Sequence, residues 1–228
     1  MTTSCCDLSF EVENRALQSQ GTSDAGIYEM AASALSEHFA GSGILVDVGC
    51  GSGQLRAFVS SFFDKYVGVD VIRYGEFPDD CEFHQSDLNK PIQTLPDNCS
   101  DAVTALEIVE HLENPRALFR ELVRIVKPGG LILVSTPNQL SFLSLLTLVV
   151  KHLFSAFQDV HYPAHLTSLL EVDLRRIAEE CGLEEISFSY TLQGRMVLSA
   201  WHYPRFLSRR FPRALSDNLM LIGRKALD

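Results

Sequence analysis

The chain has 228 residues and a mass of 25.4 kDa, which fits one sizeable domain but not two full ones. Hydrophobic residues make up 46% of it and charged residues 21%, a balance that excludes a wholly disordered chain and a fibrous repeat. Because 19 basic and 29 acidic residues give a net charge of -10, long polyphosphates repel the protein, and no nucleic-acid partner is expected.

The first residues are polar and weakly patterned, which predicts a flexible N-terminal arm over residues 1–25 and a domain over residues 26–228. They contain neither the basic region nor the long apolar stretch of a signal peptide. The most apolar run, Leu140 to Val150, is shorter than the roughly 20 residues of a helical bilayer span. With six cysteines that show no C-x-x-C pairing, the pattern predicts a cytoplasmic protein with reduced thiols.

An amphipathic helix over residues 26–39 opens the domain, and apolar strands and helices then alternate. The expected strands cover residues 44–48, 66–70, 81–84, 101–106, 131–134, 186–190 and 219–223, and the expected helices cover residues 54–63, 115–126 and 170–181. Continuous apolar strands separated by helices predict an α/β fold, in which helices cover both faces of a parallel sheet. Ligands of such folds bind at the carboxyl ends of the strands.

A glycine-rich turn follows the first strand, in the sequence V-D-V-G-C-G-S-G over residues 46–53. Gly49, Gly51 and Gly53 let the backbone turn tightly and come close to a ligand, while the next helix begins with free N–H groups. A dinucleotide fingerprint requires a glycine where this chain has Gln54. A nucleotide-type site is therefore expected, and an NAD(P)-dependent oxidoreductase remains an alternative.

Two carboxylates follow later strands at the same edge of the sheet. Asp70 ends the second strand, where it could accept hydrogen bonds from both hydroxyls of an adenosine ribose. Asp87 follows the third strand, where it could accept one from an adenine amino group while Leu88 packs on the ring. The alternative is that both acids are ordinary loop residues.

Taken in order, five segments resemble the class I S-adenosylmethionine-dependent methyltransferases over about residues 26–190: V-D-V-G-C-G-S-G, V-G-V-D, Q-S-D-L, L-E-I-V-E-H-L and K-P-G-G-L-I-L-V-S-T-P-N. The resemblance implies a doubly wound, Rossmann-like sheet of seven strands, mostly parallel, with the last strand antiparallel. It also implies that S-adenosylmethionine is bound by Asp47, Gly49, Cys50, Gly51, Gln54, Asp70, Val71, Asp87, Leu88 and Glu107.

The segment Glu107-Ile108-Val109-Glu110-His111 follows the fourth strand and faces the expected cofactor site. If it is helical, Glu107, Glu110 and His111 converge on one face. His111 is then a candidate general base, since its reference pKa of about 6.5 suits proton removal near neutrality. The segment resembles E-x-x-E-H in ubiquinone-type O-methyltransferases and small-RNA 2′-O-methyltransferases. That resemblance implies catalysis by the three residues or a divalent metal bound to them; a purely structural role is the third interpretation.

Residues 139–168 are expected to form a helical insertion after the fifth strand, with one or two helices over residues 139–157. A helix that is apolar almost all round is usually buried, in a core or a homodimer contact. The alternatives are a lid over a hydrophobic substrate and a peripheral membrane contact. Residues 186–216 contain no acid and five arginines, Arg195, Arg205, Arg209, Arg210 and Arg213. They could meet an anionic lipid surface or a phosphate-bearing substrate, and the alternative is a solvated loop paired with the acidic body.

Three further side chains are expected to touch the substrate. Tyr28 lies in the first helix, and His161 and His165 lie in the insertion. The two histidines are either loop or pocket residues or additional metal ligands. The leading hypothesis is a methyltransferase that acts on a small-molecule or lipid-linked acceptor, most simply at oxygen. An oxidoreductase and a non-catalytic binding module on the same fold are the alternatives.

Overall fold

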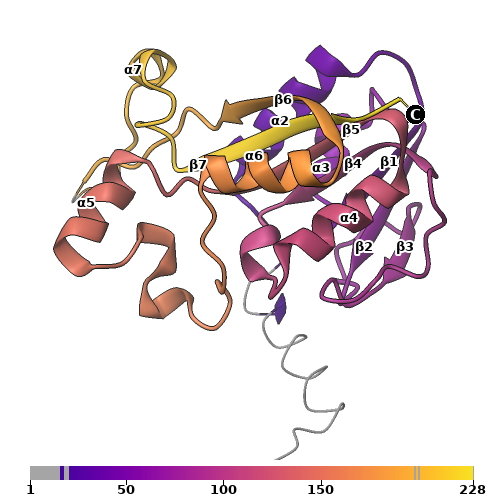
Figure 1. Ribbon diagram of the computed structural model, residues 1–228, viewed down its shortest axis with the longest axis horizontal. Helices are drawn as coiled ribbons and strands as arrows, with labels where there is room; N and C mark the ends of the chain where they lie inside the picture. Colours follow the sequence, from indigo (N-terminus) through magenta and orange to yellow (C-terminus); the bar gives the residue numbers. More distant parts are fainter. Residues whose placement is uncertain (1–15, 18–20, 198, 200, 228) are drawn as a thin grey trace, which may run out of the picture.

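Seven strands form one sheet in the computed structural model, which describes residues 16–17, 21–197, 199 and 201–227 (Figure 1). The strands are β1 (Ile44–Val48), β2 (Lys65–Asp70), β3 (Glu82–Gln85), β4 (Ser100–Leu106), β5 (Val126–Pro137), β6 (Leu183–Tyr190) and β7 (Asn218–Lys225). Their order across the sheet is β3-β2-β1-β4-β5-β7-β6, and only β7 runs antiparallel to its neighbours. The predicted doubly wound sheet with an antiparallel last strand is confirmed.

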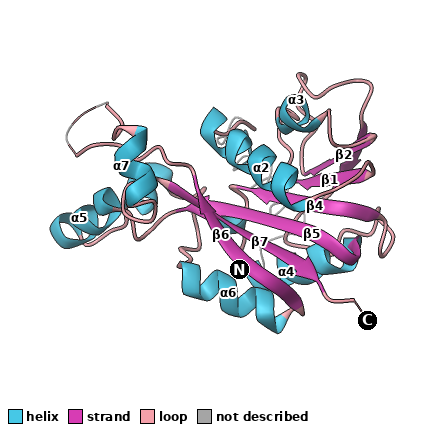
Figure 2. Cartoon of the chain, turned by 90° about the horizontal axis from the view of Figure 1, so that it is seen from above, coloured by secondary structure: helices cyan, strands magenta, loops and turns pink. Residues whose placement is uncertain are grey.

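Helices cover both faces of the sheet, as Figure 2 shows. One face carries α2 (Ala25–His38) and α3 (Leu55–Val59), and the other carries α4 (Pro115–Ile125) and α6 (Glu171–Glu180). Each face has its own apolar core, one around Leu35 and Leu55 and the other around Phe119, Leu122 and Leu174. The centre of the sheet is thus buried on both sides, which is why its central strands are mostly apolar without alternation.

Two elements differ most from their predicted bounds. Helix α3 ends at Val59 instead of residue 63, because the chain turns to stack Phe63 on Phe39, with ring centroids 4.5 Å apart. Strand β5 begins at Val126, before the expected residue 131. Gly129 has a φ of 74°, and the register against β4 shifts between Ser100 and Ala102, so the chain enters the strand directly after α4.

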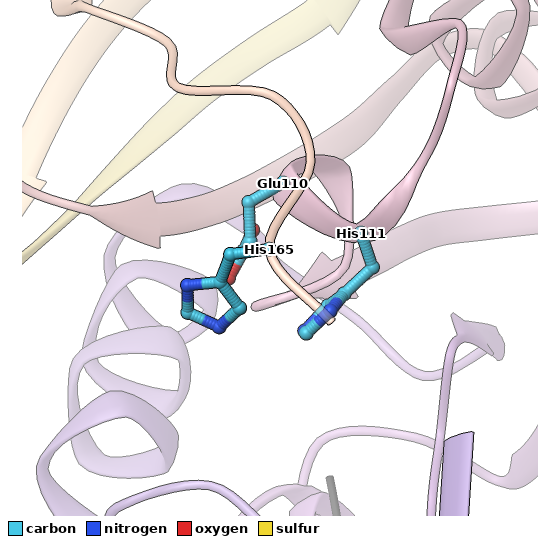
Figure 3. Close-up of side chains that lie close together, drawn as sticks. All are labelled: Glu110, His111 and His165. Atoms are coloured by element: carbon cyan, nitrogen blue, oxygen red, sulfur yellow. The ribbon is translucent and has the colours of Figure 1, made fainter. Parts of the chain in front are cut away.

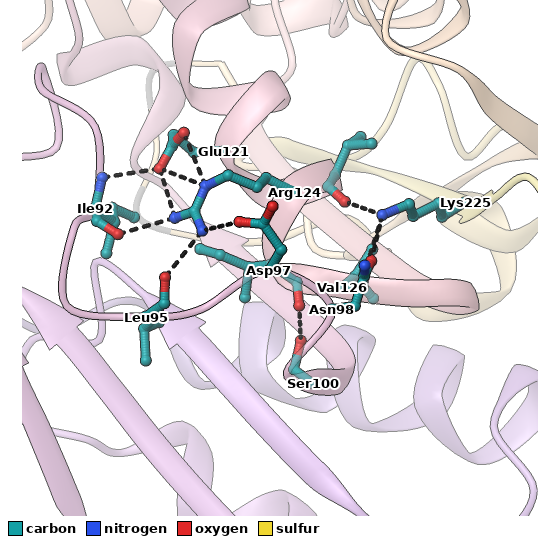
Figure 4. Close-up of polar contacts among 11 residues, drawn as sticks. Ile92, Leu95, Asp97, Asn98, Ser100, Glu121, Arg124, Val126 and Lys225 are labelled. Carbon is teal, nitrogen blue, oxygen red and sulfur yellow. Dashed lines mark hydrogen bonds and ion pairs between the residues drawn. The ribbon is translucent and has the colours of Figure 1, made fainter.

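Arg124, in the last turn of α4, holds the chain between β3 and β4 in place (Figure 4). Its guanidinium donates to the carbonyl oxygens of Ile92 (2.8 Å) and Leu95 (2.9 Å) and to the carboxylates of Asp97 and Glu121. These contacts join a loop that has no secondary structure of its own to a helix of the core.

The insertion extends beyond the end of the sheet. It contains α5 (Phe142–Lys151) and two short 3₁₀ turns, Ser155–Phe157 and Asp159–His161, and it lies beside α7 (Arg205–Arg210) in both overall views. The expected burial of this helix in the core is wrong, because Ser144 is the one buried residue of α5. Within the described part of the chain, no helix has the length and apolar character needed to cross a bilayer.

The expected N-terminal arm falls mostly outside the described residues. The residues just before α2 are described, and they form hydrogen bonds with the domain. Asp24 caps α2 by accepting a hydrogen bond from the N–H of Gly26, and the carbonyl oxygen of Gly21 accepts one from the N–H of Ser52 (2.9 Å). Cysteines 50, 81, 99 and 181 are unpaired thiols.

Candidate active site

A cavity of about 500 Å³ opens at the carboxyl ends of β1, β2 and β4. Volumes of this size are typical of small-molecule sites. Besides the strand ends, the start of α2, the insertion and the first residue of β7 contribute to its wall. The cavity therefore lies where a doubly wound sheet is expected to bind its ligand.

The glycine-rich turn forms the floor of the cavity. Gly51 has a φ of 51°, and its N–H donates to the carboxylate of Asp70 at 2.8 Å. A Cβ atom on Gly51 would lie 2.0 Å from the carbonyl oxygen of Gly21, so no other residue fits without moving the chain before α2. The turn thus joins β1, β2 and the segment before α2 at one point.

Asp70 and Asp47 are buried carboxylates on the cavity wall. Asp70 accepts hydrogen bonds from the backbone N–H groups of Gly51 and Val71, and burial raises its pKa. Asp47 accepts from the hydroxyls of Tyr66 and Thr104, and burial raises its pKa to about 6 despite those bonds. Because burial disfavours the charged form, both carboxylates would be stabilised by a ligand that carries positive charge or donates hydrogen bonds.

Most of the residues expected from the sequence line this cavity. They are Tyr28, Asp47, Gly49, Cys50, Gly51, Asp70, Val71, Leu88, Glu107, Glu110, His111, His161 and His165. Two expected residues do not line it. Gln54 is exposed at the start of α3, and the carboxylate of Asp87 turns to Lys90 (3.0 Å) and Asn89, whereas Leu88 and Asn89 face the cavity.

Glu107 does not converge with Glu110 and His111 in the way a helix would impose. It has a φ of 54°, and only Val109–His111 form a 3₁₀ turn. Its carboxylate accepts hydrogen bonds from the Ser135 hydroxyl (2.8 Å) and the Asn218 amide (2.6 Å). Burial and the neighbouring Glu110 carboxyl raise the pKa of Glu107 well above its ordinary value. Each of its oxygens thus accepts one hydrogen bond within the protein, and Glu107 is not part of the cluster that Glu110 and His111 form with His165.

Glu110 is fully buried at the back of the cavity. Its Oε2 accepts a hydrogen bond from the Thr136 hydroxyl at 3.1 Å, while Oε1 has no partner among the described residues. Burial raises the pKa of this carboxyl. Its backbone carbonyl accepts from the N–H groups of Leu166 and Thr167, so the end of the insertion is fastened to the 3₁₀ turn.

Glu110, His111 and His165 form a cluster, although His165 comes from the insertion (Figure 3). One ligand atom from each lies within 4.8 Å of the others. The Nδ1 atoms of His111 and His165 lie 2.8 Å and 2.7 Å from the carbonyl oxygens of Ala164 and Ala156. Because a carbonyl only accepts, each ring carries its proton on Nδ1 when neutral, and Nε2 then carries a lone pair.

His161 and His165 stack with ring centroids 5.4 Å apart, and His111 meets His165 edge-on at 4.8 Å. Burial and the two neighbouring imidazoles lower the pKa of His165 to about 4. His161 Nδ1 is buried and has no hydrogen-bond partner among the described residues. His165 is therefore neutral near pH 7 and suited to accept a hydrogen bond or to bind a cation.

Several cavity residues have no counterpart in the sequence reasoning. Thr22 and Ser23 belong to the expected arm, yet they line the cavity, and the N–H of Ser23 donates to the Tyr28 hydroxyl at 2.9 Å. Asn218 reaches the site from the start of β7, 111 residues after Glu107. Asp24 is a residue type that favours the N-cap of a helix, so the sequence could have indicated that the chain is ordered just before α2. No local pattern signals Asn218.

The chain is similar to known methyltransferases. A family model described as a methyltransferase domain matches residues 27–187. A mitochondrial ubiquinone biosynthesis O-methyltransferase of Dictyostelium discoideum is 33% identical over 126 residues, which are 46% of this chain and 38% of that protein. A probable S-adenosylmethionine-dependent methyltransferase of Mycolicibacterium smegmatis is 25% identical over 196 residues, covering 83% of this chain and 71% of that protein.

Among solved structures, an S-adenosylmethionine-dependent methyltransferase from Archaeoglobus fulgidus shares the fold, with a TM-score of 0.63 and 19% identity over 87% of this chain and 94% of that chain. The matched region spans less than half the length of the ubiquinone biosynthesis enzymes. These findings favour the methyltransferase family over the dinucleotide-dependent oxidoreductase. The chain belongs to the class I S-adenosylmethionine-dependent methyltransferases, the family that its five sequence segments resemble.

Proposed function

We propose that this methyltransferase transfers the methyl group to an oxygen atom of a small-molecule or lipid-linked acceptor, with His111 as the general base. The observation that carries the proposal is the orientation of the His111 ring, whose Nδ1 is held by the Ala164 carbonyl in the wall of the cavity. The partial similarity to ubiquinone biosynthesis O-methyltransferases supports an oxygen acceptor.

The residues of the cavity fit the cofactor that the family implies. Asp70 and Leu88 both line the cavity, where Asp70 would accept hydrogen bonds from ribose hydroxyls and Leu88 would pack against the adenine ring. The buried Asp47 carboxylate, together with Glu107 and Glu110, suits a positively charged ligand. When bound, S-adenosylmethionine supplies a methyl group on a positively charged sulfur that an acceptor can attack in line.

The protein then has to bring the acceptor into line and remove its proton. His111 Nε2 would take the proton from the acceptor hydroxyl, and the acceptor oxygen would then receive the methyl group that the cofactor supplies. The Ala164 carbonyl supports the protonated ring, because a protonated imidazole donates from both nitrogens.

In a second candidate mechanism, the same cluster binds a metal ion. Glu110, His111 and His165 would hold a divalent cation that acidifies the acceptor hydroxyl. The specific observation that favours it is that both imidazoles donate their other N–H to a backbone carbonyl, an arrangement typical of metal-bound histidines. Two imidazoles and a carboxylate suit zinc or a similar transition metal.

One experiment separates the two mechanisms. Transfer of a labelled methyl group is measured with phenols and catechols that carry apolar chains of increasing length, first in EDTA and then with magnesium, manganese or zinc. Turnover in EDTA supports the base mechanism, and turnover that appears only with a metal supports the metal mechanism. For either one, His111→Gln reduces kcat by roughly 100-fold or more while S-adenosylhomocysteine binds normally. Loss of that binding in His111→Gln would contradict both.

A further inference from the structure

Exposed apolar side chains gather at the end of the molecule that carries α5 and α7, which lie at the same end in Figures 1 and 2. The two regions are tied together, because the N–H of Phe142 donates to the carbonyl oxygen of Ala214 at 2.7 Å. We call this region the α5/α7 surface. Its exposed apolar side chains are Phe142, Leu145, Leu146, Val149, Val150, Trp201, Phe206 and Phe211.

The exposure on this surface is large. Val149, Trp201 and Phe206 are 74%, 77% and 71% exposed. Single exposed apolar side chains are common, but a group of them on neighbouring elements marks a contact with another apolar phase. Most of the large exposed apolar side chains in the described part of the protein lie in the insertion or in the segment that contains α7.

The same region carries five arginines, of which Arg195, Arg205 and Arg213 form ion pairs with Asp217, Glu29 and Glu171. Arg209 and Arg210 are exposed at the end of α7, and neither forms an ion pair with a described residue. The segment over residues 186–216 contains no acidic residue, although the whole chain has a net charge of -10. The Arg210 guanidinium lies over the Phe211 ring at 5.2 Å, so its charge and an apolar face are presented together.

We infer that the α5/α7 surface docks on the surface of a bilayer that contains anionic phospholipids. The apolar side chains of α5 would enter the boundary between headgroups and acyl chains, and Arg209 and Arg210 would contact phosphates. Helix α5 has 10 residues, which is about 15 Å of helix, so it can lie in the interface but cannot cross the bilayer.

Charge favours a bilayer over a second copy of the chain as the occupant. A two-fold dimer brings the same patch of both copies together. Arg209 and Arg210 of each copy would then be desolvated against a surface from residues 186–216 that has no acid to pair with them. Anionic headgroups supply the missing opposite charge.

Docking in this way would bring the cavity to the membrane. The insertion that carries α5 also supplies Val160, His161, Ala164 and His165 to the cavity wall, and Val160 is 84% exposed. An acceptor with an apolar tail could thus pass from the bilayer toward the cavity along one segment of chain. The docking itself does not depend on the proposed O-methyl transfer, and its test requires no acceptor.

The chain contains a built-in reporter for this test. Trp201 is its single tryptophan and belongs to the α5/α7 surface. Its fluorescence is measured while vesicles of phosphatidylcholine, alone or with 40% phosphatidylglycerol, are added (the composition is roughly that needed for a strong surface potential). The expected result is a blue shift with the anionic vesicles that weakens as salt is raised from low to physiological concentration.

Two double variants are compared with matched controls. The double variant Arg209→Glu with Arg210→Glu is expected to weaken vesicle binding by roughly 30-fold or more. Its control is Arg120→Glu with Arg176→Glu, which makes the same charge change at exposed sites on α4 and α6 and should retain most of the vesicle binding. Val149→Ser with Val150→Ser is expected to weaken binding by about tenfold or more, and Val172→Ser on α6 is its control. Thermal shift with S-adenosylhomocysteine verifies that each variant is folded.

Three results would overturn the inference. The first is no fluorescence change of the wild-type protein with anionic vesicles. The second is a loss of binding in the control variants equal to that in the Arg209 and Arg210 variant, which would attribute binding to overall charge. The third is a dimer, seen by sedimentation without lipid, that dissociates in the Val149 and Val150 variant, which would assign the surface to a second copy of the chain.

Discussion

A side chain at each glycine of the turn after β1 would meet a different obstacle. A side chain on Gly49 would meet Ile108, and one on Gly51 would meet the backbone of Gly21. A flexible side chain can move aside, whereas a backbone oxygen held by hydrogen bonds from Ser52 cannot. Gly51 is thus the residue at which the floor of the cavity and the chain before α2 depend on each other.

The first prediction concerns Gly51→Ala. The substitution is expected to lower the free energy of unfolding by about 1–2 kcal/mol, because alanine disfavours a left-handed backbone. It should also weaken S-adenosylhomocysteine binding by roughly tenfold or more, since the clash with Gly21 moves the cavity wall. Calorimetric titration measures the affinity. Gly75→Ala is the control, because a Cβ there meets open space and leaves affinity unchanged.

The second prediction follows from the lowered pKa of His165, which lies between His111, His161 and the buried Glu110. Below about pH 6.5 the unfolded chain binds a proton at this histidine, but the folded protein does not bind one until about pH 4. Stability contributed by the neutral ring is therefore present above pH 6.5 and is lost as the pH falls toward 4.

His165→Gln should remove this part of the pH dependence. The wild type is expected to lose about 1 kcal/mol more than the variant between pH 7 and pH 5, a value reduced to allow for the partial exposure of the ring. Urea unfolding at the two pH values measures the difference. His38→Gln, at an exposed position in the last turn of α2, serves as the control, and equal pH dependence of His165→Gln and wild type would contradict the assignment.

At the scale of elements, the loop between β3 and β4 depends on one side chain of α4. Arg124 satisfies two backbone carbonyls of that loop, and Glu121 accepts a hydrogen bond from the N–H of Ile92 at 2.8 Å. Ile92 is buried in the core, so the polar contacts fix the position of an apolar anchor. A loop without secondary structure is held here by a charged network and not by strand pairing.

The third prediction is that Arg124→Ala lowers the free energy of unfolding by roughly 1–3 kcal/mol, because it leaves the Ile92 and Leu95 carbonyls without their donor and removes the partner of Glu121. Arg120→Ala removes an exposed arginine one turn earlier on the same helix, and it should change stability by no more than about 0.5 kcal/mol. Chemical unfolding of both variants gives the comparison. Similar losses in the two would refute a specific role for the Arg124 network.

The elements themselves were predictable because the central strands are mostly apolar runs bounded by polar residues or glycine, and five segments in order resemble one family. Burial of the insertion was not predictable, since an apolar helix has the same pattern whether it faces a core or an external surface. The helical geometry expected for Glu107 was wrong for another reason. Its conformation is set by a left-handed backbone and by Asn218, a contact 111 residues away that no local pattern records.

For the molecule as a whole, the fourth prediction is that S-adenosylhomocysteine stabilises the folded protein. S-adenosylhomocysteine at about 100 times its Kd should raise the free energy of unfolding by about 2.7 kcal/mol, because it binds the folded state alone. NADH at the same concentration should give no comparable change. Thermal unfolding with each ligand provides the measurement, and stabilisation by NADH alone would contradict the family's implied cofactor.

The position of β7 also affects how the protein forms during synthesis. This strand lies between β5 and β6, and Asn218 at its start bonds to Glu107 beside the cavity. When β6 leaves the ribosome, the strand that separates it from the rest of the sheet has not yet been made. Until it is, β6 has no neighbour to pair with and Glu107 lacks one of its donors. A nascent chain that already contains the glycine-rich turn and Asp70 would therefore gain its complete cofactor cavity only after residues 218–225 have emerged.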